Sequence, residues 1–473
     1  MGTISSAFDM ISGALNADQS ALSIVANNVA NANTPGYTEE TPNWRENSPI
    51  EINGVAYGSG VTQTGATSLR DRVLEERLDQ QQQLASASGA RLTALNSVQA
   101  LFTPDSGSTS ATAGDIGSDI TGFFNSFSSL EANPTDNALR QQVLSSASTL
   151  AGDVSNAAAS LNGQRAALDQ DASGITSQVN SLTGAIAQLN QQIQSTSPNT
   201  DAGTLDDDRQ QDLSQLSKLI GINQITTENN GLSITTTSGQ LLVSEGSSFQ
   251  LTTGMAGGVT HFYIGTTDVT SQLAGGGGEL AGYLTARDQD IPSVMTSLDQ
   301  LACGVSTQVN ALNNSGTDLD GLTGTVANPL YIFNQPAVVA GSAANMSVVM
   351  TDPNQIAAAG LGQGTGDNSN AAAMANLASQ LIANGQTPSN YYSNFVSTLG
   401  STVSSVQTEN TAQNASVTQL QTQNDALSSV NLNDEASSME TLERSYQAAS
   451  QVFTMLNTIM NSALNLGVQT AVT

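Results

Sequence analysis

Residues 4–37 read ISSAFDMISGALNADQSALSIVANNVANANTPGY, and this stretch decides how the N-terminal end of the chain folds. Its large apolar residues recur on alternating steps of three and four, with Asp18 at the one skipped position. That spacing predicts a helix with a heptad-type apolar seam, which requires a helical partner. The seam consists of Ile4, Phe8, Ile11, Leu15, Leu22, Val25 and Val29.

The C-terminal end carries the same pattern. Its seam consists of Met439, Leu442, Tyr446, Ala449, Phe453, Leu456, Met460 and Ala463. Burying the large apolar residues of the N-terminal seam yields about 2 kcal/mol each, roughly 14 kcal/mol in all. Ordering the residues from Ile4 to Val29 costs about 1–2 kcal/mol per residue, which is more. We therefore expect the two terminal helices to pair with each other but to stay disordered in the isolated monomer.

Three further helical tracts lie between the ends, at residues 69–102, 136–193 and 399–430. The longest would extend roughly 85 Å as an unbroken helix. Glycines 152, 163 and 174 recur within it and mark either close helix contacts or breaks. These tracts predict a bundle of long helices.

A different pattern begins at residue 222, where β-branched residues alternate with polar ones up to residue 270. Asn229, Asn230 and Gly231 predict a hairpin turn there. Residues 316–366 are irregular or β-rich. The predicted fold class is mainly α with a β insertion, in an elongated multi-domain protein. The expected domains are 1–35 with 431–473, the terminal coiled coil; 36–220 with 279–315 and 385–430, the helical bundle; and 221–278 with 316–384, a β-rich outer insert.

Charge and composition exclude several partners. The formal net charge is -29, and Lys218 is the only lysine. Without a basic cluster, nucleic acid and anionic membranes are not expected partners. No apolar run is long enough to insert into a membrane, and no charged segment precedes an apolar block as in a classical signal peptide. The single Cys303 excludes an intrachain disulfide.

Candidate catalytic groups are few. His261 is the only histidine and lies in a strand-like segment without a nucleophile motif. Asp318 and Asp320 resemble the start of a calcium loop, but the remaining ligands are missing. The loop of residues 362–366 is glycine-rich and lacks the lysine of a phosphate-binding loop. We expect no enzyme activity, no cofactor and no metal.

The most specific segment is residues 27–37, NNVANANTPGY. Physically, its asparagines can end a helix, its proline bars continuation and its glycine permits a reversal. The order of its residues also resembles the N-terminal signature of the bacterial flagellar axial proteins, which are the rod, hook and hook-associated subunits. The matching residues are Asn27, Asn28, Asn31, Asn33, Pro35, Gly36 and Tyr37. Segments 129–136, 138–144, 278–288, 433–436 and 445–449 are similar to the hook-associated members.

The resemblance implies a structural subunit of the hook–filament junction. Family members are exported through the flagellar type III apparatus and assemble with copies of themselves as a helical ring at the distal end of the hook. Expected partners are the hook protein, the second hook-associated or filament proteins, and the export chaperone FlgN. The chaperone is expected to share Tyr446, Phe453 and Leu456 with the assembled contact. A secreted coiled-coil adhesin, or a type III-exported effector that displays its β region, is the alternative.

Overall fold

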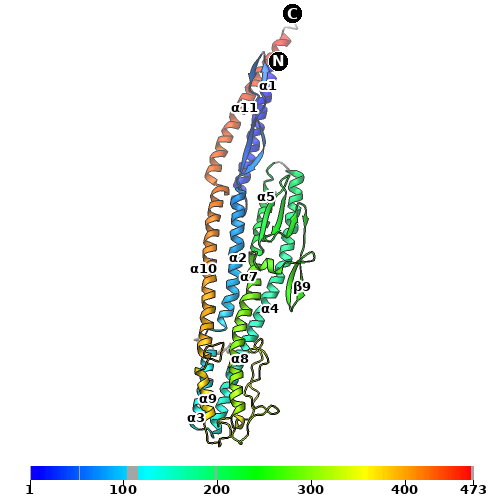
Figure 1. Cartoon of the computed structure of the whole chain (residues 1–473). Coiled ribbons are helices and arrows are strands. Elements are labelled where there is room, and N and C mark those ends of the chain that lie inside the picture. Colours follow the sequence, from blue (N-terminus) through cyan, green and yellow to red (C-terminus); the bar gives the residue numbers. More distant parts are fainter. Residues whose placement is uncertain (1, 53, 104–114, 198–199, 470–473) are drawn as a thin grey trace.

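The computed structural model describes residues 2–52, 54–103, 115–197 and 200–469. The molecule is elongated, and both termini lie at the same end (Figure 1). Helices α1 (Gly2–Asn31) and α11 (Leu432–Gln469) lie side by side there, although they come from opposite ends of the sequence. The predicted pairing of the terminal helices is therefore confirmed.

Long helices form the body of the molecule, as predicted. The three predicted tracts correspond to α2 (Arg72–Ala100), α4 (Asn137–Thr196) and α10 (Pro388–Ser428). The bundle also contains α3 (Ile116–Ala132) and α8 (Ile291–Ser315). Helix α4 begins where the Asp136 carboxylate accepts hydrogen bonds from the first free N–H groups, and it continues for 60 residues. Glycines 152, 163 and 174 lie inside it, and a Cβ at any of them would meet nothing within 4 Å. They mark neither a break nor a close contact.

One hydrophobic core lies at the end of the bundle far from the termini. It joins α2, α3, the first half of α4, α8, α10 and the short α9 (Ser369–Asn376). Phe123 is 0% exposed, and its ring centroid lies 5.2–5.4 Å from those of Phe124, Phe127 and Phe333. The periodic apolar stripes of these helices thus meet within a single chain.

A second core connects the other half of α4 to two small antiparallel sheets. The surrounding helices are α5 (Thr204–Leu219), α6 (Thr270–Ala274) and α7 (Gly278–Thr285). The strands are β5 (Ile222–Thr226), β6 (Leu232–Thr236), β7 (Leu241–Ser244), β8 (Ser247–Ser248), β9 (Leu251–Ala256), β10 (Val259–Ile264) and β11 (Thr267–Asp268). Asn229 and Asn230 both have positive φ, and the hairpin β5–β6 forms around them as predicted.

Residues 316–384, which we placed in a β-rich insert, are mostly irregular, which is the other possibility that the sequence left open for residues 316–366. Their described β structure is three isolated bridges, Thr317 with Ala359, Phe333 with Val348, and Ala383 with Gln386. Side chains from α8 satisfy much of this backbone instead. Asn310 donates to the carbonyl of Phe333 and accepts from the amides of Ile332 and Phe333. Asn313 donates to the carbonyls of Leu330 and Gln355 and accepts from the amide of Ala357. The segment lies at the end of the bundle away from the termini (Figure 1). The proposed division into domains stays a prediction.

Four strands were not predicted from the sequence. β1 (Glu40–Glu46) pairs with β4 (Val61–Ser68), and β2 (Ile50–Ile52) pairs with β3 (Val55–Tyr57) at the tip. This long hairpin lies along α1 (Figure 1). It gives the terminal helix pair a third element, in a part of the chain that we had assigned to the helical bundle.

Candidate functional site

The two terminal helices run antiparallel. Asn28, near the end of α1, donates from Nδ2 to Oε1 of Glu435 near the start of α11, over 2.9 Å. Phe8 packs edge-on against Phe453 further along α11, with ring centroids 5.3 Å apart. These two contacts fix the register along which the predicted seams face each other.

The N-terminal seam is only partly covered. Val25 is buried, Val29 is exposed, and Ile4, Phe8, Ile11, Leu15 and Leu22 are half-buried. The most buried apolar positions of α1 are instead Ala17 and Ala21, with Val25. The hairpin covers another side of α1, and the backbone oxygen of its Val61 comes within 3.4 Å of where a Cβ on Gly13 would lie. Small residues thus lie where α1 meets two neighbours.

Asp18 occupies the skipped seam position and is buried. Its Oδ2 has no hydrogen-bond partner among the residues that the structure describes. A buried polar atom without a partner costs free energy. The terminal pair of one chain is thus weaker than its heptad pattern indicates.

The C-terminal seam is more exposed still. Met439, Leu442 and Leu456 are half-buried, whereas Tyr446, Phe453 and Met460 are 37–39% exposed. Outside the seam, Val452, Met455 and Ile459 are exposed as well. A hollow of about 390 Å³, lined by Val25, Trp44 and Leu442, lies beside the seam. Helix α11 therefore presents apolar surface that a single chain leaves uncovered.

Asn28 is the centre of the signature segment. Besides Glu435, it donates to the carbonyl of Glu40 over 2.8 Å, and its Oδ1 accepts from the Glu40 amide and the Tyr37 hydroxyl. Burial, followed by the charge of Glu40, raises the pKa of Tyr37, so the phenol keeps its proton for this bond. Asn28 thereby holds the end of α1, the start of β1 and the start of α11 together.

The rest of the signature shapes the turn. Asn31 donates to the backbone and side-chain oxygens of Asn27, and Asn27 donates to the Tyr37 hydroxyl over 3.3 Å. Gly36 has φ +83°, a conformation that a residue with a Cβ adopts at a cost. Asn33 and Pro35 are exposed at the bend. The spacing of the motif therefore positions one buried asparagine and one tyrosine.

An ion-pair cluster attaches this turn to the bundle. Arg70 pairs with Asp207 and, at 3.5 Å, with Glu75, and it donates to the carbonyl of Asp206. The Asp207 carboxylate also accepts from the amide of Thr38, just after the signature. Sequence reasoning missed the pairing of Arg70 with Asp207, because the two residues lie far apart in the chain.

The residues considered for catalysis have structural partners. The imidazole Nδ1 of His261 lies 2.6 Å from Oδ2 of Asp268 in the adjacent strand. Asp318 accepts from the amides of Asp320 and Leu322 and so closes a turn. Within the described ranges of the chain, no three His, Cys, Asp or Glu side chains gather as a metal site would require. Among the described helices, none is both long and apolar enough to cross a membrane.

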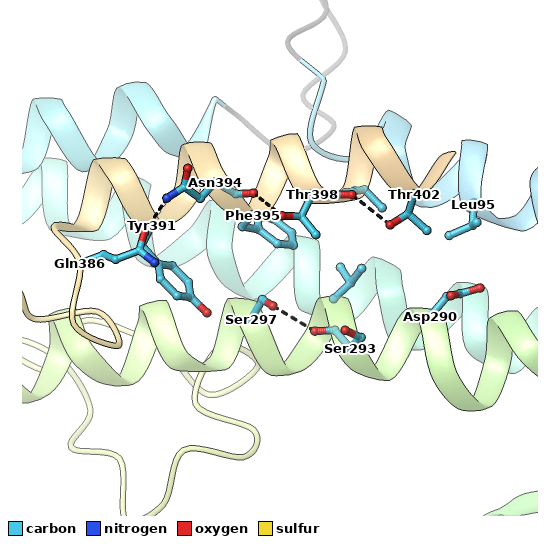
Figure 2. Close-up of a pocket in the computed structure, with 12 residues that line it drawn as sticks. Leu95, Asp290, Ser293, Ser297, Gln386, Tyr391, Asn394, Phe395, Thr398 and Thr402 are labelled. Carbon is cyan, nitrogen blue, oxygen red and sulfur yellow. Dashed lines mark hydrogen bonds between the residues drawn. The ribbon is translucent and has the colours of Figure 1, made fainter. Parts of the chain in front are cut away.

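Figure 2 shows a groove of about 260 Å³ between α8 and α10. Its hydroxyl groups bond to carbonyls of their own helices: Thr398 donates to Asn394, and Thr402 donates to Thr398. The Tyr391 hydroxyl donates to Gln300 over 2.8 Å. These polar groups are satisfied locally, so they do not converge on a substrate position.

Comparisons with known proteins found similarity to flagellar proteins in both the terminal region and the bundle. Residues 106–326 match the family described as "Flagellar hook-associated protein FlgK helical domain", and residues 9–38 match "Flagella basal body rod protein". Proteins named "Flagellar hook-associated protein 1" from Salmonella typhimurium and Escherichia coli are each 24% identical, over 96% of this chain and 98% of theirs. The protein of the same name from Bacillus subtilis is 25% identical, over 96% of this chain and 96% of its own length.

A solved structure shares the fold. The flagellar hook junction protein FlgK from Burkholderia pseudomallei superimposes with a TM-score of 0.64 at 18% identity, covering 73% of this chain and 99% of that one. The similarity of sequence thus extends over nearly the whole chain, including the signature turn and the long helices. The chain is therefore similar to the flagellar hook-associated protein 1 (FlgK) proteins in sequence over nearly its whole length and in fold.

Proposed function

We propose that this chain is a structural subunit of the flagellum that forms the hook–filament junction by assembling with copies of itself at the distal end of the hook. One observation carries the proposal: α1 and α11 pair along a seam that one chain covers only partly. Apolar surface left exposed in a monomer drives association when it meets a complementary surface. Similarity to flagellar hook-associated proteins over nearly the whole chain supports this role over an adhesin or effector.

The neighbours follow from the same reasoning. The ring contacts the hook protein on one side and the second hook-associated or filament proteins on the other. Before export to the flagellum, FlgN covers the exposed face of α11 at Tyr446, Phe453 and Leu456. We propose no catalytic activity and no cofactor, since the candidate residues serve turns and strand pairs.

The test is deletion of residues 1–30, which removes almost the whole of α1. We expect cells that carry this variant to lose filament attachment, while the purified variant keeps its helical bundle by circular dichroism. A matched control shortens the exposed β9–β10 turn at Gly257 and Gly258, far from the terminal pair. Normal filaments in the deletion strain would overturn the junction role.

The chaperone contact has its own test. Replacing Tyr446 and Phe453 by serine should weaken co-purification with FlgN at least tenfold in affinity, because two large apolar contacts are lost. The exposed Met255, in the sheet region, provides the control substitution. Unchanged binding by the double variant would place the chaperone elsewhere.

A further inference from the structure

The hairpin that lies along α1 ends in a tip, formed by β2 and β3, with one apolar face. Ile50 lies directly opposite Tyr57, so their side chains share a face, and Val55 lies two residues before Tyr57 on that same face. Ile50, Tyr57 and Val55 are 42%, 52% and 53% exposed. Glu51 pairs with Ala56 and lies on the opposite face. The chain thus projects an apolar surface that it does not cover.

The hollow of about 390 Å³ beside the terminal seams is the complementary feature. Its apolar lining comes from Val25 of α1, Pro42 and Trp44 of β1, and Leu442 of α11. Trp44 is the only tryptophan in the sequence, and it is 44% exposed. A water molecule occupies about 30 Å³, so the hollow has room for a large side chain. Since Val25 and Leu442 belong to the two seams, the hollow continues the surface that one chain leaves uncovered.

A buried acid at the hollow lacks a partner. Glu435 of α11 lines the hollow and is 5% exposed. Its Oε1 accepts from Asn28, but its Oε2 has no hydrogen-bond partner among the residues that the structure describes. A buried polar atom in that state costs free energy. Glu39 and Glu40 also border the hollow, so a negatively charged occupant would be repelled. A tyrosine side chain offers both an apolar ring and a hydroxyl donor.

The tip of one chain does not reach its own hollow. Gly60, just beyond the tip, lies against Met10 of α1, because a Cβ on this glycine would come within 2.9 Å of the Met10 Cγ. The hollow lies further along α1, at Val25. The helical rise of 1.5 Å per residue separates Met10 from Val25 by about 22 Å. A second copy, displaced along the terminal helices by a similar distance, would bring its tip to the hollow.

We propose that the hairpin tip of one copy inserts Ile50, Val55 and Tyr57 into the hollow of a neighbouring copy, where the Tyr57 hydroxyl donates to Oε2 of Glu435. The inference rests on the proposed function, because it names a contact by which copies of the chain assemble. It concerns the assembled chain, in which α1 and α11 are paired. Tip and hollow are different surfaces, so each copy gives its tip to one neighbour and its hollow to another. Such a heterologous contact builds a ring or a helix.

Disulfide formation in assembled flagella tests the contact. The full chain carries Tyr57→Cys with Ser438→Cys in a Cys303→Ala background, so the introduced cysteines are its only thiols. Ser438 lines the hollow and is exposed. Purified flagella are oxidised with copper phenanthroline and analysed on a non-reducing gel. A disulfide requires Cα atoms within about 7 Å, which the tip and hollow of one chain do not meet. We therefore expect a ladder of dimers and higher oligomers of this chain alone.

Control cysteines isolate the contact. Tyr57→Cys alone and Ser438→Cys alone should give no ladder, and neither should Tyr57→Cys with Ser404→Cys, at an exposed site on α10. Flagella that contain the first pair and carry filaments, but show no ladder, would overturn this inference and leave the proposed function intact. An adduct with a different flagellar protein, or a dimer from Tyr57→Cys alone, would do the same. Absence of the wild-type chain from purified flagella would overturn the proposed function as well.

Side-chain variants test the fit of the tip, and they decide even if the double-cysteine chain does not assemble. Tyr57→Ser with Val55→Ser should lower the number of filaments per cell at least about threefold, because apolar contacts within an interface are lost. Tyr57→Phe keeps the ring and loses only the hydroxyl, so its effect should be smaller. Met255→Ser, at an exposed apolar site on β9, should have none. Filament numbers are normalised to the amount of each chain that cells export. Equal numbers for wild type and the double serine variant would overturn the inference.

Discussion

The far end of the bundle and the terminal pair are built from the same kind of helix, yet they bury their apolar residues to very different degrees. Phe123 is 0% exposed among three other phenylalanines, whereas Phe453 packs against Phe8 and remains 37% exposed. The far core is complete within one chain, and the terminal seam is not. The first region therefore accounts for the stability of the monomer. The second leaves apolar surface exposed, and burying that surface against other chains would stabilise an assembly.

The largest effect is expected from the far core. Phe123→Ala removes a fully buried ring and leaves a cavity, which should lower the free energy of unfolding by about 3–5 kcal/mol. Urea unfolding of the purified chain measures it. Phe249→Ala, at an exposed position, is the matched control and should change stability by less than about 0.5 kcal/mol. Similar values for both variants would contradict the assignment of monomer stability to this core.

Arg140 provides a polar test of the same region. It is 1% exposed, and its guanidinium donates to the carbonyls of Pro134, Asn354 and Ile356. Arg140→Met keeps the apolar volume but removes these hydrogen bonds, and of the three carbonyls only those of Asn354 and Ile356 keep a backbone donor, so we expect a loss of about 2–3 kcal/mol. Arg77→Met, at an exposed site on α2, should be nearly neutral. A neutral result for Arg140→Met would mean that residues 316–387 do not depend on this clamp.

These two regions also differ in how much the sequence reveals. Helix α4 was predictable because its apolar residues repeat regularly over many turns, and the β5–β6 hairpin because Asn229 and Asn230 accept positive φ locally. Residues 316–366 were predicted to be irregular or β-rich, and the sequence could not decide between the two because Asn310 and Asn313 of α8 satisfy the backbone of this segment from a distance. Non-local hydrogen bonds leave no periodic trace in a sequence.

The terminal region shows the same limit. The heptad pattern predicted which helices pair, but the register depends on Asn28 meeting Glu435, which are more than 400 positions apart. The hairpin from β1 to β4 was missed because its strands include Pro42 and many polar residues, and its register shifts between Pro42 and Trp44. Its stability comes from packing along α1 rather than from strand propensity.

A smaller effect is expected at the buried asparagine of the signature. Asn28→Ala removes four hydrogen bonds and leaves the Glu435 carboxylate and the Glu40 backbone without this partner. We expect a local loss of about 1–2 kcal/mol in the terminal pair, seen as faster hydrogen exchange in α1 and at the start of α11 of the assembled chain. Urea unfolding of the bundle should stay unchanged. Asn33→Ala, at an exposed position of the same motif, is the control, and an equal effect there would remove the special role of Asn28.

The smallest effect on the monomer should come from Phe453, and it separates the two regions most clearly. Phe453→Ala loses a partly exposed ring and one edge-on contact, about 1 kcal/mol in a single chain. In an assembly the remaining surface of the ring is also buried, so the loss grows with each chain that contacts it. We expect normal unfolding of the monomer but a marked loss of junctions in electron micrographs of the cells. Phe453→Leu keeps an apolar contact and should retain most of them. If Phe453→Ala cost the monomer as much as Phe123→Ala, the terminal seam would be part of the folding core, and its exposure would have no meaning for assembly.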